Sequence, residues 1–354
     1  MTKDKSILIK NIYWMLAYAF DVLKQGEYEN VKIEKFDHIH NLFAAILAKG
    51  IGRLLKQGLY REYVSCKEDM TVIRGKIDMQ GTMRNQIARK KLILCNFDEL
   101  SENNILNQII KTTVTILIRN GEVNDKYKDE LKKEMLFFSN VDTVEPSLIR
   151  WTNLRYQRNS QTYQMLISIC QLTLEGMLQT TEDGKYKLAS FVDLPHLSRL
   201  YERFILEYYV KEHPDIKTSA SQIPWKLDDD ERTLLPRMKS DTMLLLDNCV
   251  LIIDAKYYAH ITQVNFDALT IRSNNLYQIF TYVKNKDASF GNVPHKVSGI
   301  LLYARTDEDI QPDITYQMSG NQISVKTLDL NREFPEIAKQ LDQIVEDHFG
   351  NIPF

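Results

Sequence analysis

The sequence predicts an α/β protein (α+β overall) with two domains, and three observations favour this class. The chain has 354 residues, 44% of them hydrophobic and 26% charged, with 13 glycines and 9 prolines. This composition is typical of a globular protein with more than one sizeable core. Several segments have apolar residues at helical spacing, whereas shorter apolar runs have the length of buried strands. In the C-terminal half the order is helix, strands, helix, strand, which is typical of an α/β domain.

The N-terminal domain, residues 1–145, is predicted to be mixed. Its apolar segment at residues 12–20 is shorter than the roughly 20 apolar residues that span a bilayer, and it has no small-residue cleavage site. We interpret this segment as a core helix and expect no contact with a membrane. The other expected elements are a helix at 36–57, short strands at 59–79, and helices at 104–119 and 123–138.

The C-terminal domain is predicted to span residues 146–354, with a hinge near Pro146. The expected helices are 163–177, 195–213, 274–284 and 333–348, with hairpins at 241–254 and 314–329 and a strand at 299–305.

Charge and cysteine content narrow the classes of function. A formal net charge of -2 excludes a generally basic nucleic-acid coat, although 45 Lys and Arg residues leave room for a local basic groove. The four cysteines form no CxxC motif, so neither a zinc site nor a disulfide framework is predicted. Reduced thiols are typical of a cytoplasmic protein, and this is the expected location.

Charged residues lie close to two apolar runs in the stretch LLPRMKSDTMLLLDNCVLIIDAKYYAHIT. The pair Asp247-Asn248 predicts a two-residue hairpin turn between the runs. If these two residues form the loop, the numbers of cross-strand partners sum to 495, so Asp241 lies opposite Asp254. Lys256 is two residues beyond Asp254 and points to the same side of its strand. The hairpin therefore brings two carboxylates and one ammonium group together.

Two carboxylates so close together repel each other unless a cation lies between them. Mg²⁺ suits this position because it takes hard oxygen ligands, often one or two carboxylates with waters and phosphate oxygens. Lys256 beside such an ion can orient or help to deprotonate a water and can stabilise charge on a phosphate. The alternative is a structural ion pair between Lys256 and Asp241 or Asp254.

The arrangement of Asp241, Asp254 and Lys256 resembles the PD-(D/E)xK nuclease signature. It differs from the common pattern because Ser240 stands where proline is usual and position 254 is Asp rather than Glu. The resemblance implies a restriction-endonuclease-like domain with a central mixed sheet flanked by helices. It also implies a metal site made by the two aspartates and the backbone carbonyl of Ala255.

Two helices next to the hairpin carry further residues that match this superfamily. Glu202, on the preceding helix, fits the position of an additional metal ligand. Gln278 and Tyr282, on the following helix, resemble its Q-x-x-x-Y element and would support the site. The alternative interpretation of Glu202 and Gln278 is ordinary helix surface.

Segments spread over nearly the whole chain resemble the McrC family, the nuclease subunit of McrBC-type modification-dependent restriction systems. These segments are IKNIYWMLAYAFD (9–21), GLYREYV (58–64), IRGKIDM (73–79), FDELSENNILNQIIK (97–111), LYERFILEYY (200–209), IIDAKYY (252–258) and YQIFTY (277–282).

The resemblance implies that the C-terminal domain cuts double-stranded DNA containing modified cytosine and uses Mg²⁺. The N-terminal domain would dock onto a hexameric AAA+ GTPase of the McrB type and stimulate it. The chain contains no G-x-x-x-x-G-K-[ST] phosphate loop, so GTP would be used by the partner and not bound by this chain alone.

Two other functions remain open on the sequence. A stand-alone nuclease or resolvase with the same fold would cut DNA without GTP or a partner. A non-catalytic adaptor would activate the GTPase while its nuclease face served only structure. The basic segment MRNQIARKKL and the turn RGKID are compatible with contacts to a partner or to phosphates, and also with a solvated charged face.

Overall fold

The computed structural model describes residues 3–4, 7–24, 28, 31, 34, 36–156, 160–180, 186–188, 194–229, 231, 233–258, 260–265 and 268–350. The chain forms two compact units, one of residues 1–42 with 175–354 and the other of residues 43–174. This division differs from the predicted boundary at residue 145, because the N-terminal segment belongs to the same unit as the C-terminal half.

Side-chain contacts explain why the N-terminal helix α1 (Ile9–Ala19) belongs to the first unit. Asn11 Nδ2 donates hydrogen bonds of 2.7 and 2.8 Å to the carbonyl oxygens of Leu330 and Arg332. The ring of Trp14 stacks on Phe334 with centroids 4.4 Å apart. The apolar segment predicted as a core helix is therefore confirmed, but the core that it enters is that of the C-terminal half.

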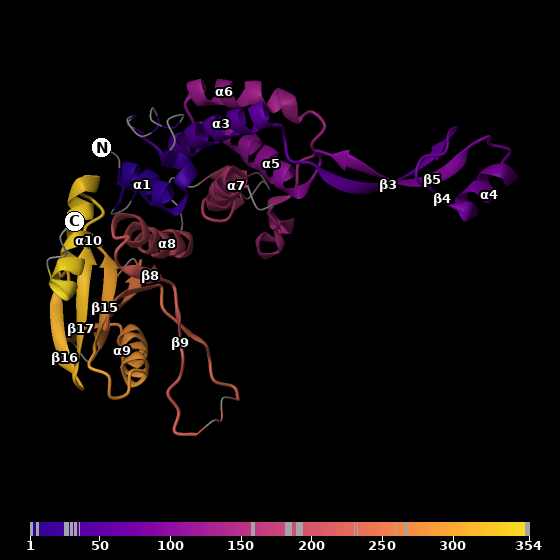
Figure 1. Ribbon diagram of the computed structural model, residues 1–354. Helices are drawn as coiled ribbons and strands as arrows, with labels where there is room; N and C mark the ends of the chain where they lie inside the picture. The colour runs from indigo at the N-terminus through magenta and orange to yellow at the C-terminus, as the bar shows by residue number, and fades with distance from the viewer. Residues whose placement is uncertain are drawn as a thin grey trace. The chain divides into compact units, whose positions relative to one another are not determined.

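The first unit is built on a mixed sheet whose described strands follow the order β16-β17-β15-β12-β11-β8 (Figure 1). The strands are β8 (Lys217–Ser219), β11 (Thr242–Leu246), β12 (Cys249–Lys256), β15 (Lys296–Ala304), β16 (Ile314–Met318) and β17 (Asn321–Leu328). The three central strands β12, β15 and β17 are parallel, whereas β11 and β16 pair with them antiparallel. The carboxyl ends of β12, β15 and β17 therefore lie at the same edge of the sheet, and ligands of α/β proteins bind at such an edge.

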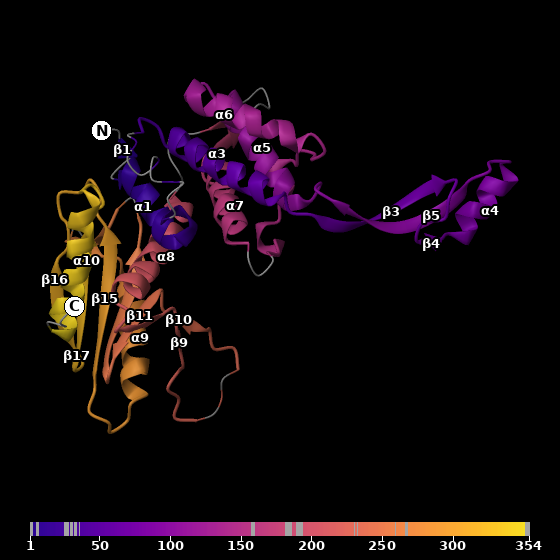
Figure 2. The same cartoon turned by 45° about the horizontal axis from the view of Figure 1, so that its top comes forward.

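Helices cover both faces of this sheet (Figure 2). They are α8 (Leu194–Glu212), α9 (Ser273–Ala288) and α10 (Phe334–Phe349). On one face α9 packs closely on β15, because a Cβ at Gly299 would lie 2.7 Å from both Ile279 and Val283. On the other face Ser298 and Ile300 lie beside α10. The predicted mixed sheet flanked by helices is confirmed.

The second unit consists of a helical body and a long β-arm. The body contains α3 (Ile39–Gln57), α5 (Ile105–Arg119), α6 (Asp125–Met135) and α7 (Gln161–Leu174). Tyr163 of α7 ties the body together, since its hydroxyl donates to Asn107 Oδ1 at 2.8 Å and accepts from the Tyr60 N–H at 2.8 Å. The helices predicted in this region are confirmed. Pro146, the predicted hinge, begins a short 3₁₀ helix inside the unit.

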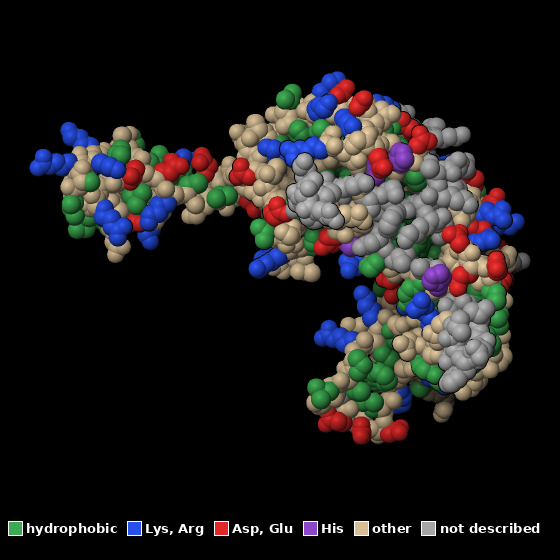
Figure 3. Space-filling model, turned by 180° about the vertical axis from the view of Figure 1, so that it is seen from behind, with side chains coloured by type: hydrophobic (Ala, Val, Ile, Leu, Met, Phe, Trp, Pro, Cys, Tyr) green, Lys and Arg blue, Asp and Glu red, His purple; other side chains and the backbone are tan. Residues whose placement is uncertain are grey.

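The β-arm is formed by β3 (Glu62–Met70), β4 (Lys76–Ile77), α4 (Met79–Ile87) and β5 (Ile93–Ser101), and it projects from the body (Figure 1). Gly75, at φ 72°, makes the turn in RGKID, where a Cβ would lie 2.4 Å from the Asn96 oxygen. Large apolar side chains are nevertheless exposed along the arm: Tyr63, Val72, Ile73, Met79, Met83, Ile87 and Leu100. Lys and Arg side chains gather with them at its far end (Figure 3).

The remaining elements are short. They are β1 (Lys3–Asp4), β2 (Ile7–Leu8), β6 (Leu178–Thr180), β7 (Tyr186–Leu188), β9 (Gln222–Ile223), β10 (Met238–Lys239), β13 (Thr262–Asn265), β14 (Ala268–Ile271) and the 3₁₀ turns Asp21–Lys24, Leu136–Phe138, Pro146–Leu148 and Trp151–Asn153. In the described part of the chain, every helix is too short or too polar to cross a bilayer.

Candidate active site

The β11–β12 hairpin has the register that the sequence predicts. Its ladder runs from Thr242 opposite Ile253 to Leu246 opposite Cys249, so the numbers of partners sum to 495. Asp247 takes the first position of the turn with φ 50°, a conformation that Asp tolerates better than most residues. One further step along the ladder brings Asp241 opposite Asp254. The predicted meeting of these side chains follows from the confirmed register.

Asp241 precedes β11 directly and is half-buried. Its Oδ2 accepts a hydrogen bond of 2.9 Å from the backbone N–H of Ala255. Since Ala255 lies between Asp254 and Lys256, this bond holds the Asp241 carboxylate against the strand that carries the other two charges. The backbone carbonyl of Ala255 remains a predicted metal ligand.

Asp254 is completely buried, and Lys256 is its cationic partner. The Lys256 Nζ lies 2.8 Å from Asp254 Oδ2, and the two side chains are 14% and 1% exposed. Apart from this ion pair, neither Asp254 oxygen has a hydrogen-bond partner among the described residues. A buried carboxylate without hydrogen bonds is costly, so the ammonium group provides its main compensation.

The pKa values of this pair show how strongly burial acts. Burial, opposed by the charge of Lys256 and reinforced by the nearby Asp241, raises the pKa of Asp254 to about 7. Burial alone would lower the pKa of Lys256, but the charges of Asp254 and Asp241 outweigh burial and raise it. Lys256 is therefore protonated near neutral pH, and Asp254 titrates close to neutrality. Perturbed groups of this kind cluster at functional sites.

Glu202, in the middle of α8, is half-buried near the same charges. Its Oε1 accepts a hydrogen bond of 3.1 Å from the Ser198 hydroxyl, one turn earlier. Burial and the charge of Asp241 raise the pKa of Glu202, while Lys256 acts in the opposite direction. The fold thus brings Glu202 within electrostatic range of Asp241 and Lys256, although its predicted metal contact stays a prediction.

Gln278 and Tyr282 lie one turn apart on α9 and interact with each other. Gln278 Nε2 donates a hydrogen bond of 2.9 Å to the Tyr282 hydroxyl. The Tyr282 ring is buried in the core cluster between α9 and the sheet. Neither side chain is hydrogen bonded to Asp241, Asp254 or Lys256 among the described residues, so their supporting role remains a prediction.

Three residues near Lys256 are not indicated by the sequence as part of the site: Tyr258, Asn275 and Tyr303. Asn275 Nδ2 donates a hydrogen bond of 2.8 Å to the hydroxyl of Tyr303, which lies opposite Lys256 in the β12–β15 ladder. The Tyr258 hydroxyl is 3.4 Å from Asn275 Oδ1. The sequence offers little signal for this network, because its members come from a strand end, a helix start and a second strand that pair only in the fold.

The donor set fits Mg²⁺. In the described part of the chain, no three His, Cys, Asp or Glu side chains gather closely enough to hold a metal together. Mg²⁺ does not require three, because it is often bound by one or two carboxylates with waters and phosphate oxygens. Asp254 supplies two buried oxygens that have no hydrogen-bond partner among the described residues, and the register brings Asp241 opposite it.

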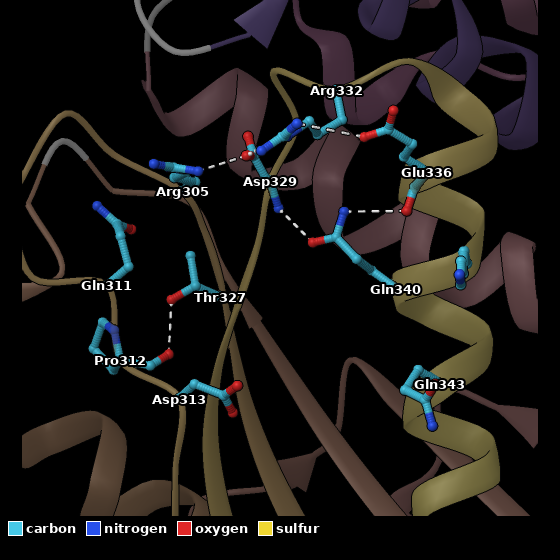
Figure 4. A pocket seen from close by; sticks show the side chains of 11 residues that line it. Arg305, Gln311, Pro312, Asp313, Thr327, Asp329, Arg332, Glu336, Gln340 and Gln343 are labelled. Atoms are coloured by element: carbon cyan, nitrogen blue, oxygen red, sulfur yellow. Dashed lines mark hydrogen bonds and ion pairs between the residues drawn. The ribbon is translucent and has the colours of Figure 1, made fainter.

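A cavity of about 710 Å³ lies away from these residues, between the ends of β15 and β17 and helix α10 (Figure 4). Its two arginines are already paired, since Asp329 Oδ2 lies 2.6 Å from Arg305 Nη1 and 3.2 Å from Arg332 Nε. Despite its size, this cavity has no counterpart of Asp254 among its described residues, that is, no fully buried carboxylate whose main partner is a single lysine. We therefore place the candidate active site at Asp241, Asp254 and Lys256.

Comparison with known proteins matches this chain to one family over most of its length. The family described as "McrBC 5-methylcytosine restriction system component" matches residues 3–304. The chain is 27% identical over 346 residues to the "Type IV methyl-directed restriction enzyme EcoKMcrBC" of Escherichia coli (strain K12), covering 97% of this chain and 98% of that protein.

A solved structure shares the fold. It is the half-complex from a tetradecameric assembly of Thermococcus gammatolerans McrB AAA+ hexamers with bound McrC, and it matches with 17% identity and a TM-score of 0.51. The match covers 96% of this chain and 76% of the other. With a family match that spans both units and the charged hairpin, the chain belongs to the family of McrBC 5-methylcytosine restriction system components.

Proposed function

We propose that this chain is the Mg²⁺-dependent endonuclease subunit of a GTP-driven restriction complex that cuts double-stranded DNA containing modified cytosine. The observation that carries the proposal is the convergence of Asp241, Asp254 and Lys256 at the carboxyl edge of the sheet. The similarity to a methyl-directed restriction enzyme over 97% of the chain supports the substrate class.

Asp241 and Asp254 would hold the metal, with the Ala255 carbonyl and Glu202 as additional ligands. Bound Mg²⁺ supplies Lewis acidity at a phosphate oxygen and lowers the pKa of a bound water. The register of the hairpin prepares this site, because it fixes both aspartates before any ligand arrives. Such preorganisation avoids the free energy of rearranging the charges during the reaction.

Lys256 would orient the attacking water and stabilise the negative charge that develops on the phosphate. Its pKa is raised by Asp254 and Asp241, so the ammonium form dominates near neutral pH and a direct role as a base is disfavoured. An ammonium group beside a developing oxyanion in a buried site is a strong electrostatic contribution.

The partner would be a hexameric AAA+ GTPase of the McrB type, and the β-arm would dock onto it. The arm exposes apolar side chains such as Ile87, at 81%, and Val72, at 71%. Monomeric proteins rarely expose large contiguous apolar patches, and such patches rimmed by polar residues are typical of interaction sites. The solved structure of similar fold is an assembly in which McrC is bound to McrB hexamers, which supports this type of partner.

A reconstitution tests the proposal. The chain is combined with the candidate GTPase, GTP, Mg²⁺ and methylated or unmethylated DNA, and both cleavage and GTP hydrolysis are measured. Asp254→Ala and Lys256→Ala should abolish cleavage and leave stimulation of the GTPase intact. Asp247→Asn, in the exposed turn of the same hairpin, is the matched control and should cut normally.

The other outcomes distinguish the alternatives. Robust cutting by the isolated chain with Mg²⁺ would favour a stand-alone nuclease or resolvase. Stimulation of the GTPase without any cleavage of methylated DNA would favour a non-catalytic adaptor. Cleavage by the Asp254→Ala variant would refute the assignment of the active site.

A further inference from the structure

A second cavity, of about 320 Å³, lies next to the end of β12, and the described residues that line it are one arginine and five neutral polar side chains. Its lining residues are Tyr258, Gln263, Arg272, Ser273, Asn274 and Asn275. None of them is Asp or Glu, so the guanidinium group of Arg272 gives the lining a positive charge. This composition matches an anionic oxygen-rich ligand, for which Arg, Ser, Asn, Gln and Tyr are the common protein donors.

The cavity is close to the candidate active site. Tyr258 follows Lys256 by two residues, so their Cα atoms are at most about 7 Å apart. On its inner side Asn275 is 6% exposed and connects the two tyrosines, with Tyr258 3.4 Å from its Oδ1 and Tyr303 2.8 Å from its Nδ2. Tyr303 is the ladder partner of Lys256. The wall of the cavity is thus continuous with the strand pair that carries the catalytic charges.

Among the described residues, no carboxylate forms an ion pair with Arg272, which is held in place by other groups. Its guanidinium carbon lies 4.8 Å from the centre of the Tyr258 ring, a cation–π distance. Its Nε and Nη2 are both 3.3 Å from the His260 carbonyl oxygen. A guanidinium group has five N–H donors, so most of its hydrogen-bonding capacity and its full charge remain available.

The cavity beside α10 shows the contrast (Figure 4). There Arg305 and Arg332 share Asp329, and Glu336 and Asp313 also line the space. Carboxylates in those positions neutralise the arginines and repel phosphate. None of the described residues that line the cavity at Arg272 is a carboxylate.

We propose that the cavity at Tyr258 and Arg272 binds a backbone phosphate of the DNA strand, within a few nucleotides of the bond that is cut. The proposal rests on the proposed nuclease function and adds a substrate contact to it. A single strand rises about 3.4 Å per nucleotide along the duplex axis, and Lys256 and Tyr258 have Cα atoms at most about 7 Å apart, so the two sites suit phosphates a few nucleotides apart. Arg272 is a positioning residue: it aligns the strand on Asp241, Asp254 and Lys256 and does not touch the reacting phosphate.

DNA binding by the full chain in the complex, measured by fluorescence anisotropy over a range of salt concentrations, tests this proposal. Arg272→Gln keeps much of the side-chain volume and removes the charge. It should weaken binding about tenfold and lower the slope of log K against log salt by about 0.9, the contribution of one phosphate contact. Arg305→Ala, which removes an arginine already paired with Asp329, is the matched control and should leave both quantities unchanged.

A chemical change in the DNA locates the contact. Neutral methylphosphonate groups replace single phosphates on either side of the cut. For the wild type, a methylphosphonate at the contacted phosphate should lower DNA affinity as much as Arg272→Gln does. The same methylphosphonate should not lower the affinity of the Arg272→Gln variant any further. Cleavage should show a raised KM with a nearly unchanged kcat at saturating DNA, since the contact positions the strand.

The outcomes separate this proposal from the proposed function. If the wild-type complex cuts DNA but Arg272→Gln has wild-type affinity, salt slope and methylphosphonate profile, the phosphate site is refuted and the nuclease stands. If the complex does not cut DNA, the nuclease proposal fails, and DNA binding with the predicted dependence on Arg272 still supports the contact. A further binding experiment replaces DNA with GTP. GTP binding by the wild type that is lost in Arg272→Gln would refute a DNA site in favour of a nucleotide site.

Discussion

Asp241 is joined to Ala255 across the hairpin, where the Asp241 Oδ2 accepts a hydrogen bond of 2.9 Å from the Ala255 N–H. The bond joins Asp241, which directly precedes β11, to Ala255, which lies between Asp254 and Lys256 on β12. A side-chain oxygen therefore continues the hydrogen-bond pattern of the ladder beyond its last backbone pair. Strand β12 therefore holds Asp254 and Lys256 directly, and the hydrogen bond to Ala255 holds the carboxylate of Asp241 beside them.

Mg²⁺ binding should become stronger as the pH rises to about 7 and then level off. The pKa of Asp254 is raised to about 7, so protons compete with the cation below that pH. The apparent Kd for Mg²⁺ should increase about tenfold for each pH unit below 7, because one proton is displaced. Isothermal titration calorimetry between pH 5.5 and 8.5 measures this dependence. Asp254→Asn should bind weakly at every pH, and a flat profile in the wild type would contradict the prediction.

Lys256→Met should destabilise the metal-free protein at pH 8 and much less at pH 5. The variant leaves the buried Asp254 without its cation, and breaking a buried pair typically costs about 3–5 kcal/mol. Because Lys256 lowers the pKa of Asp254, its loss raises that pKa further. A raised carboxyl pKa gives stability that is complete below the unfolded value and is lost as the pH rises through the folded value.

Thermal unfolding at the two pH values measures the effect of Lys256→Met, and a double variant provides its control. Adding Asp254→Asn removes the unpaired charge, so the double variant should regain most of the stability at pH 8. Equal destabilisation of Lys256→Met at pH 5 and pH 8 would show that lost packing, rather than the charge of Asp254, is responsible.

Glu202→Gln should raise the Mg²⁺ concentration needed for half-maximal cleavage about tenfold, with little change in stability. The amide can keep the hydrogen bond from Ser198 but loses the charge near Asp241 and Lys256. Changes in groups that support metal ligands commonly alter affinity or activity by about 10–100-fold. Glu207→Gln on the same helix is the control, because Glu207 pairs with Lys211 instead. An unchanged Mg²⁺ requirement would leave Glu202 as helix surface.

Ile87→Glu at the end of the β-arm should reduce binding to the GTPase partner, and stimulation of GTP hydrolysis, about tenfold or more. The side chain is 81% exposed, so the change leaves the fold intact while placing a charge in the proposed interface. Leu136→Glu is a matched control in the same unit outside the arm, at 76% exposure. Surface plasmon resonance and GTPase assays compare the two variants, and equal effects of both would argue against docking through the arm.

Much of the fold follows from local sequence patterns. The helix predicted at 104–119 is α5 (Ile105–Arg119), and the helix predicted at 333–348 is α10 (Phe334–Phe349). Both have a strongly one-sided apolar pattern, which is the clearest signal in a single sequence. Helix α4 (Met79–Ile87) was not predicted, because its polar sequence MQGTMRNQI has no buried stripe. It is held instead by the Asp78 cap and by close packing of Gly81 on Leu94.

The candidate site also has features that follow from the local sequence and features that do not. The sequence by itself determined the two-residue turn and the register of the β11–β12 hairpin, and through them the meeting of Asp241, Asp254 and Lys256. These features are local, because a strand alternates with a period of two and a short turn fixes the pairing.

Only the tertiary structure decided what surrounds these residues. It buried Asp254, paired β12 in parallel with β15, placed Asn275 and Tyr303 beside Lys256, and brought the first helix into the C-terminal unit. Such contacts join segments distant in the chain, and they depend on how whole faces of helices and sheets fit together. No short stretch of sequence encodes that fit.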